Sequence, residues 1–353
     1  MNQIRIWKRE NRHGNNRVIR FFQEMCGKMK KLYLITGATG HVGTILVSEL
    51  IKRGEQIRAL VLPGHGTHLP QEIDITEGDI TEENSLVPFF NRNGYDRVTL
   101  IHCAALITVA SKLNPHVWNI NVQGTENVMR QAYAAGVDRV VYVSSVHAIP
   151  ERPEPEVITE VNHFSPDLVH GQYAKSKAAA AQKVLDYAEK GLNVSIVHPS
   201  GIIGPGDIQN KNHMIRTIHA IAKGTIPVAL HGGYDFVDAR DVVDGILACE
   251  EKGRAGECYI LNGHYITVSD LLNIIRKMRG KAVRKTVLPH SMAKVFAPAA
   301  ERISILFKRP SPLFTPYSVY TLHTNGHFSH EKASKEFDYE PRDIVESIRA
   351  SLP

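Results

Sequence analysis

The sequence has few cysteines, and no two of them are spaced as a redox or metal-binding pair. Its 353 residues include Cys26, Cys103, Cys249 and Cys258, and no C-x-x-C motif occurs. Cys103 lies in an apolar segment, as a buried free thiol would. This usage excludes a disulfide framework and is typical of a reducing compartment, so we expect a cytoplasmic protein with unpaired thiols.

Long apolar runs are absent, and the body of the chain has no excess of one charge. No run is long enough for a transmembrane helix, and the N-terminus lacks the apolar core of a secretory signal. The net charge of +6 comes from residues 1–30, which hold eight Lys and Arg against two Glu. The remainder balances 34 basic against 34 acidic residues. We therefore expect neither an integral membrane segment nor a nucleic-acid partner.

The first 28 residues differ from the rest of the chain. They are basic and polar, with a short apolar patch at 18–22, and the first strand pattern begins only at Lys31. We expect residues 1–28 to be a flexible extension that is dispensable or wrongly assigned to the protein. An amphipathic arm for a membrane surface or a partner is the alternative.

Three regularly spaced glycines follow the first apolar segment. Residues 32–36 are apolar, Gly37, Gly40 and Gly43 follow as G-x-x-G-x-x-G, and an amphipathic helix pattern comes next. Gly37 suits a tight turn, Gly40 a close approach to a pyrophosphate, and Gly43 close packing of helix on strand. The N–H groups that begin the helix would face the phosphates. An ordinary glycine-rich turn is the alternative, but the flanking strand and helix favour a dinucleotide site.

Apolar strand patterns alternate with helix patterns as far as residue 198. This alternation predicts an α/β fold, a doubly wound parallel sheet that binds ligands at the carboxyl ends of its strands. We expect a Rossmann domain over 29–198, to which 236–262 return, and a smaller C-terminal substrate-binding lobe made of 199–235 and 263–353. The expected strands are 32–36, 56–62, 73–77, 98–103, 139–144, 194–197 and 258–261. The expected helices are 82–91, 115–135, 172–190, 214–222, 268–278 and part of 292–316. Residues 200–207 are expected to form a loop.

A second chemical motif opens the alanine-rich helix that follows the strand ending at Ser144-Ser145. Tyr173 and Lys177 are four residues apart, so they share one face of that helix. A nearby ammonium favours the phenolate and lowers the pKa of a tyrosine. Such a tyrosine exchanges a proton with a carbinol oxygen, which hydride transfer to a carbonyl requires. An exposed Tyr and Lys on a surface helix is the alternative, and the position after the strand-end serines argues against it.

These segments together resemble the extended short-chain dehydrogenases/reductases, the superfamily of NAD-dependent epimerases and dehydratases. The resemblance runs from about residue 31 to about residue 351. The pattern P-x-G-x-x-G-P-G-D after the sixth strand is most similar to the dihydroflavonol-4-reductase and 3β-hydroxysteroid dehydrogenase branch. The motifs that carry it are Thr36–Gly43, Gly78-Asp79, His102–Ala105, Asn121–Thr125, Val143–Ser145, Tyr173 with Lys177, and His198–Asp207.

The resemblance implies a role for each motif. Tyr173 is then the general acid/base, and Lys177 lowers its pKa and holds the nicotinamide ribose. Ser145 binds the reacting oxygen, and Asn121 supports the active-site helix. The implied cofactor contacts are Gly37, Thr39, Gly40, His41, Val42, Leu62, Asp79, Ile80, Ala104, Ala105, Tyr173, Lys177 and Pro199.

The cofactor preference depends on the end of the second strand. A carboxylate there selects NAD, and Arg or Lys accepts the 2′-phosphate of NADP. By resemblance, Val61 stands where the NAD-type Asp would fall and Leu62 where the reductase-type Arg would fall. With no carboxylate to repel a phosphate, we favour NADP(H) over NAD(H), with Arg58, His65 or His68 as the phosphate ligand.

The expected activity is hydride transfer between nicotinamide and a carbonyl or secondary alcohol of a small, apolar or cyclic substrate. By resemblance, Gly201 and His198 replace the Asn and Arg that are usual in the epimerases, which argues against a sugar nucleotide. His147 and Ile202 are candidate substrate contacts, although His147 could equally be a packing residue. The alternatives are a nucleotide-sugar epimerase or dehydratase with bound NAD, and a non-catalytic dinucleotide sensor.

Two further expectations concern metals and assembly. His323, His327 and His330 cluster around a probable turn without a nearby cysteine, so we expect scattered loop histidines and no metal site. By resemblance, the helices that contain 121–135 and 172–190 would pair across a two-fold axis. The sequence therefore predicts a homodimer.

Overall fold

The computed structural model describes residues 29–353 except 67, 210–211, 227, 283–285 and 307–314. The predicted extension at 1–28, with Cys26, lies outside the described residues. Cys103, Cys249 and Cys258 are free thiols. No helix in the described part of the chain is long and apolar enough to cross a membrane.

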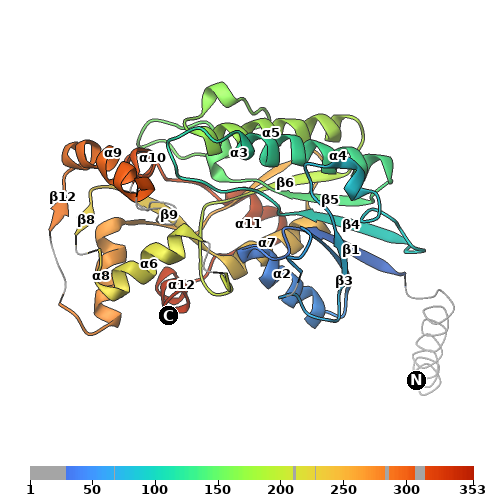
Figure 1. Cartoon of the computed structure of the whole chain (residues 1–353), viewed down its shortest axis with the longest axis horizontal. Helices are drawn as coiled ribbons and strands as arrows, with labels where there is room; N and C mark the ends of the chain where they lie inside the picture. Colours follow the sequence, from blue (N-terminus) through green and yellow to red (C-terminus); the bar gives the residue numbers. More distant parts are fainter. Residues whose placement is uncertain (1–28, 67, 210–211, 227, 283–285, 307–314) are drawn as a thin grey trace, which may run out of the picture.

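A seven-stranded sheet with all neighbours parallel forms the centre of the molecule (Figure 1). The strand order is β10-β6-β5-β4-β1-β2-β3. It confirms the predicted doubly wound sheet, and the order reverses between β1 and β4, where such folds bind ligands. The strands are β1 Lys31–Thr36, β2 Gln56–Val61, β3 Asp74–Glu77, β4 Arg97–His102, β5 Arg139–Val143, β6 Val194–Pro199 and β10 Cys258–Leu261.

Each face of this sheet has its own hydrophobic core. Leu34 and Tyr142 belong to the core beneath α4 and α5, and Ile35 and Val141 belong to the core beneath α2, α7 and α11. Successive strand residues point to opposite faces, so a strand covered on both sides is apolar throughout. Figure 1 shows the two helical layers above and below the sheet. The helices are α2 His41–Lys52, α4 Thr125–Ala134, α5 Gln172–Glu189, α7 Ala239–Lys252 and α11 Glu331–Phe337.

A smaller lobe covers one end of the sheet (Figure 1). Its three-stranded sheet has the order β11-β9-β7, and a separate core contains Ile218, Leu271 and Ile348. The chain enters this lobe after β6, returns to the large sheet for α7 and β10, and then enters the lobe again. Its elements are β7 Gly201–Ile203, β8 Ala229–Leu230, β9 Gly233–Asp238, β11 His264–Thr267, β12 Val287–Leu288, α6 His213–Lys223, α8 Val268–Met278, α9 His290–Leu306, α10 Pro316–Thr321 and α12 Ile344–Ala350.

Three local predictions need correction. The helix expected over 82–91 is only a 3₁₀ turn, η1 Glu83–Leu86. The helix does not continue because Pro88 has no N–H to donate. The Ser85 hydroxyl also donates to the carbonyls of Asp79 and Glu82, which favours a turn over a helix. Residues 201–203, expected in a loop, form β7, because they pair with β9. The helix expected over 115–135 is present as α3 Pro115–Trp118, a π-helical turn Asn119–Gly124 (η2) and α4.

Candidate active site

The glycine turn lies at the carboxyl ends of β1 and β4. Gly37 has φ +72°, and a Cβ there would lie 2.7 Å from the backbone N of Ala104. A Cβ on Gly43 would overlap the carbonyl oxygen of Gly37 and lie 2.8 Å from the Cα of Ala38. Since α2 begins at His41, its free N–H groups open onto this turn. The residues present therefore fit a dinucleotide, whose pyrophosphate would approach the side-chain-free backbone.

Two predicted cofactor contacts in this turn have other roles for their side chains. The His41 Nε2 atom lies 2.7 Å from the carbonyl oxygen of Pro205, and its Nδ1 lies 2.8 Å from the Asn212 amide nitrogen. The imidazole therefore joins the glycine turn to the lobe, and burial lowers its pKa. The Val42 side chain is part of the core. Only the backbone N–H groups of these two residues are placed for a phosphate.

The adenine end of the expected site is partly assembled. The Asp79 carboxylate accepts hydrogen bonds from the backbone N and hydroxyl of Thr81. Ile80 packs directly against Gly124 of the π-helical turn, and its carbonyl accepts from the Asn127 amide. Leu62 is 47% exposed just past β2. Asp79, Ile80 and Leu62 therefore lie at the same edge of the sheet as the glycine turn.

Arg58 is not available for a 2′-phosphate, which corrects one expectation. Its side chain is buried, and its Nε donates to the Asp74 carboxylate at 2.6 Å. Its Nη1 donates to the carbonyls of Phe89 and Asn91. These hydrogen bonds satisfy the guanidinium inside the fold. His65 and His68 are exposed on the loop after β2 and keep their place as candidates.

The proton-transfer residues gather where β5 ends and α5 begins. Ser145 is the second residue after β5, and Tyr173 lies in the first turn of α5. A side-chain hydrogen bond from Ser145 lowers the pKa of Tyr173, but burial outweighs it and raises that pKa to about 12. Tyr173 is therefore a protonated phenol at neutral pH in the absence of cofactor.

Lys177 has a different environment from the one predicted. Its Nζ lies 2.9 Å from the Val143 carbonyl oxygen and 3.2 Å from the Tyr142 hydroxyl, both on β5. Burial lowers its pKa to about 7, and Lys177 is not among the groups that lower the pKa of Tyr173. In the cofactor-free protein the Lys177 side chain is desolvated and directed to β5, so its lowering of the Tyr173 pKa stays a prediction for the cofactor-bound state.

Asn121 contacts the active-site helix, as expected. It occupies the π-helical turn, and its amide nitrogen donates to the Ser176 hydroxyl at 2.9 Å. The same amide group bonds to the backbone N and O of Leu106. The wide turn aims Asn121 into the interior, so it fixes α5 against the segment after β4.

The buried ammonium predicts a pH dependence of folding stability. The pKa of Lys177 is about 7 in the folded protein and 10.5 ordinarily. Between these values the unfolded chain binds a proton that the folded chain lacks, so Lys177 makes stability rise with pH there. In Lys177→Met, we expect the slope of unfolding free energy between pH 7 and 10 to fall by up to about 1.4 kcal/mol per pH unit. Urea unfolding at several pH values measures it.

Lys175→Met is the control, because Lys175 is exposed on the same helix. It should keep the wild-type slope. Equal slopes in wild type and Lys177→Met would contradict a desolvated ammonium at this position.

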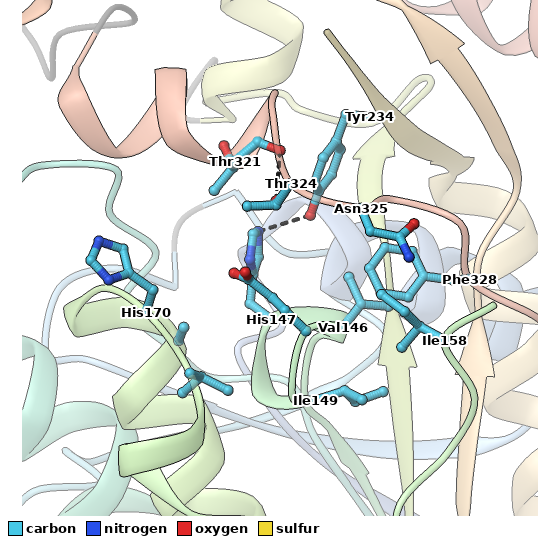
Figure 2. A pocket seen from close by; sticks show the side chains of 13 residues that line it. Val146, His147, Ile149, Ile158, His170, Tyr234, Thr321, Thr324, Asn325 and Phe328 are labelled. Atoms are coloured by element: carbon cyan, nitrogen blue, oxygen red, sulfur yellow. Dashed lines mark hydrogen bonds between the residues drawn. The ribbon is translucent and has the colours of Figure 1, made fainter. Parts of the chain in front are cut away.

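A pocket opens beside Tyr173, between the sheet and the lobe. Its cavity volume is about 30 Å³, and the space between its walls reaches about 410 Å³ only when open solvent is included. Figure 2 shows His147 near its centre, with the Tyr234 hydroxyl directed at the imidazole. The pocket has an apolar floor and a polar rim without Lys or Arg among the described residues that line it, which are Val146, His147, Ile149, Glu151, Ile158, Val169, His170, Ala174, Tyr234, Thr321, Thr324, Asn325 and Phe328.

The two candidate substrate contacts differ in outcome. His147 lines the pocket, and its ring packs edge-on against Tyr173 with centroids 5.9 Å apart. Ile202 does not line the pocket. It packs against the core on the α2 side of the sheet, because it lies on β7 and its carbonyl accepts from Asn212. The structure therefore brings His147, but not Ile202, to the pocket.

Pro199, Ala105 and Thr39 are the remaining expected cofactor contacts. Pro199 ends β6 opposite Leu261, and Ala105 follows β4 beside the glycine turn. Thr39 lies within the turn itself. No group of three or more His, Cys, Asp or Glu in the described part of the chain is arranged to hold a metal ion.

Sequence reasoning missed Tyr234 and Tyr317, whose hydroxyls lie 2.8 Å from Nε2 and 3.4 Å from Nδ1 of His147. They stand 87 and 170 residues from it in sequence. The only local sign of these rings in the sequence was a pair of glycines. Gly201 and Gly171 leave the space that the two rings occupy.

Comparison with known proteins identifies the family of this chain. Residues 33–262 match the model of the NAD dependent epimerase/dehydratase family. The chain belongs to this family.

Several relatives carry names from the branch predicted from sequence. The chain is 30% identical to sterol demethylase protein B of Methylococcus capsulatus, over 87% of the chain and 93% of the relative. It is 30% identical to a putative dihydroflavonol 4-reductase of Synechocystis, over 78% and 80%. It is 27% identical to a 3 beta-hydroxysteroid dehydrogenase/Delta 5-->4-isomerase of Mycobacterium tuberculosis, over 87% and 85%.

A solved structure confirms the fold. The crystal structure of gox2253 superposes with a TM-score of 0.77 at 30% identity, covering 92% of this chain and 97% of that one. The predicted resemblance to the extended short-chain dehydrogenases/reductases and the predicted Rossmann fold are therefore confirmed.

Proposed function

We propose that this protein is an NAD(P)-dependent oxidoreductase that interconverts a ketone and a secondary alcohol on an uncharged, apolar ring. The bound nicotinamide supplies or accepts the hydride at the carbonyl carbon. Tyr173 gives its proton to the carbonyl oxygen during reduction and takes it back during oxidation. Ser145 orients that oxygen, and Lys177, which bonds to β5 in the cofactor-free protein, holds the ribose and assists the phenol once the cofactor is bound. The proposal rests mainly on the hydrogen bond between Tyr173 and Ser145, whose chain neighbours Ala174 and Val146 line a pocket with no Lys or Arg among its described residues.

The pocket supports the substrate class. A nucleoside diphosphate needs cations or free helix N-termini for its phosphates, whereas the described lining offers one carboxylate, at Glu151. Apolar side chains such as Val146, Ile149 and Phe328 suit a hydrocarbon ring. The names of the relatives, which refer to sterols, steroids and dihydroflavonols, agree with oxygenated ring compounds.

A sugar-nucleotide epimerase is the second candidate, and the site disfavours it. In place of the Asn that the resemblance expects, Gly201 stands beneath the ring of Tyr234, 2.9 Å from a would-be Cβ. An amide side chain there would have to displace that ring. The sensor alternative is opposed by the presence of Ser145, Tyr173 and Lys177 together. The homodimer, the cytoplasmic location and the division of the chain into cofactor and substrate domains stay predictions.

The experiment follows a deuteride rather than absorbance alone. Full-length protein receives NADH or NADPH deuterated at C4, together with 2-hydroxycyclohexanone or cyclohexanone as probe ketones, and mass spectrometry locates the label. We expect deuterium on the carbinol carbon of a net alcohol product. Tightly retained nucleotide with no net product would support the epimerase, and absence of nucleotide binding would overturn both.

The preference for NADP(H) now depends on His65 and His68, since Arg58 is committed elsewhere. Glu77 opposes it. This exposed carboxylate ends β3 beside Val61 and accepts a hydrogen bond from the Gly64 backbone N at 3.0 Å. In Glu77→Gln, we expect the ratio of NADPH to NADH affinity to rise about fivefold, because a negative charge near the 2′ position is removed. Nicotinamide fluorescence titration measures both affinities.

Glu72→Gln serves as the control, since it removes an exposed carboxylate that precedes β3. An unchanged ratio in Glu77→Gln would show that this carboxylate does not face the ribose.

A further inference from the structure

Two tyrosines from distant parts of the lobe bracket His147, and a glycine supports each ring. Tyr234, on β9, lies where a side chain at Gly201 would be. The ring of Tyr317, on α10, would overlap a Cβ at Gly171, where φ is +90°. A side chain at either glycine would displace the ring above it. The positions of both hydroxyls around the imidazole are therefore set by packing.

The protons in this cluster can be counted. Burial lowers the pKa of His147 to about 4, so the ring is neutral at pH 7, with one N–H and one lone pair. Nε2 faces Tyr234 and Nδ1 faces Tyr317. One phenol must therefore donate to the lone pair, while the other accepts the N–H. The accepting phenol keeps its own O–H proton.

That remaining proton has no other partner among the described residues. Neither hydroxyl makes a second hydrogen bond within the described chain. Burial raises the pKa of both phenols, and Tyr173 raises them further, so both stay protonated. Together with His147, the two tyrosines therefore keep one O–H group near Tyr173 that donates to no other described residue.

We propose that His147, Tyr234 and Tyr317 form a substrate-recognition cluster that donates one hydrogen bond to an uncharged oxygen close to the reacting carbon. This proposal rests on the proposed function and adds the substrate class, a cyclic ketone or alcohol with a second, neutral oxygen. The ring of His147 touches Tyr173, so the recognised oxygen lies within a few bonds of the carbonyl. Both phenols are needed. A single phenol could donate its only proton to the imidazole.

A matched pair of ketones tests the proposal. 2-Hydroxycyclohexanone carries the second oxygen, and cyclohexanone lacks it. We expect wild-type kcat/KM to favour the hydroxyketone at least tenfold, since a site built to bind an oxygen discriminates against its absence. In Tyr234→Phe and in Tyr317→Phe this ratio should fall roughly three- to tenfold, the effect of one hydrogen bond.

Tyr133→Phe is the control, since Tyr133 is 49% exposed on α4, away from the pocket. It should leave the ratio unchanged. Ratios within twofold of wild type in both Tyr234→Phe and Tyr317→Phe would overturn the cluster. If neither ketone is reduced by the wild type, the proposed function fails for these probes, and the next measurement still tests the cluster.

That measurement is ¹⁵N NMR of the histidine rings in the full-length protein with cofactor, with His147 assigned by its loss in His147→Gln. We expect a neutral ring with one protonated nitrogen at pH 7, and a shift of its signals in Tyr234→Phe and Tyr317→Phe but not in Tyr133→Phe. A charged imidazole, or signals indifferent to both phenols, would overturn the proposal whatever the activity.

Discussion

Replacing Tyr173 with phenylalanine is expected to lower the rate of ketone reduction about a thousandfold, within the usual contribution of a positioned acid. The hydroxyl is the group placed by Ser145 and kept protonated by burial, and phenylalanine keeps the ring that packs against His147. Nicotinamide binding should therefore weaken by no more than about tenfold, the effect of one lost hydrogen bond. Single-turnover absorbance at 340 nm measures the rate, and fluorescence titration measures binding.

The pH dependence of the wild type provides a second test of the same assignment. Because the pKa of Tyr173 is about 12 without cofactor, the phenol can donate a proton throughout the neutral range. Tyr173 itself should therefore add no pH dependence to reduction between pH 6 and 8, and alcohol oxidation, which needs the phenolate, should accelerate as pH rises. A Tyr173→Phe variant that keeps more than a tenth of the activity would assign the proton to another group.

Replacing Gly43 with alanine should abolish dinucleotide binding and lower the free energy of unfolding by more than about 3 kcal/mol. The added Cβ would overlap the carbonyl oxygen of Gly37 and lie 2.8 Å from the Cα of Ala38. Both obstacles are backbone atoms of the phosphate-binding turn, so the helix must move away from the strand. Urea unfolding and nicotinamide fluorescence measure the two effects.

Gly54→Ala separates this overlap from ordinary backbone strain. Gly54 has φ +73°, but an added Cβ would meet nothing within 4 Å. The expected cost is about 1 kcal/mol from the left-handed backbone alone, with normal nucleotide binding. If Gly43→Ala behaved like Gly54→Ala, the close packing of α2 on the turn would not be essential.

The parts of the fold that were predicted correctly are those whose cause is local. The apolar residues of β1, the glycine spacing and the helix pattern of α2 lie within about twenty residues of one another. The same is true of Tyr173 and Lys177 on α5. In each case the spacing alone determines which side chains share a face.

The features that were missed depend on distant partners. β7 has only three residues, and it is a strand because β9 pairs with it. The sequence did not show that the Arg58 side chain turns away from the expected cofactor site. The groups that accept its hydrogen bonds, on Asp74, Phe89 and Asn91, are distant in sequence. Spacing also suggested a charge effect of Lys177 on Tyr173, but the deciding factor was burial, which only the three-dimensional structure contains.

The path of the chain has a consequence for folding during synthesis. The core beneath α2 and α7 is completed by Ala333, Phe337 and Tyr339, near the end of the chain. A nascent chain that has produced the glycine turn and even the whole of α5 still lacks the edge strand β10 and this last piece of core. The large sheet thus reaches its final packing only after residues 333–339 have left the ribosome.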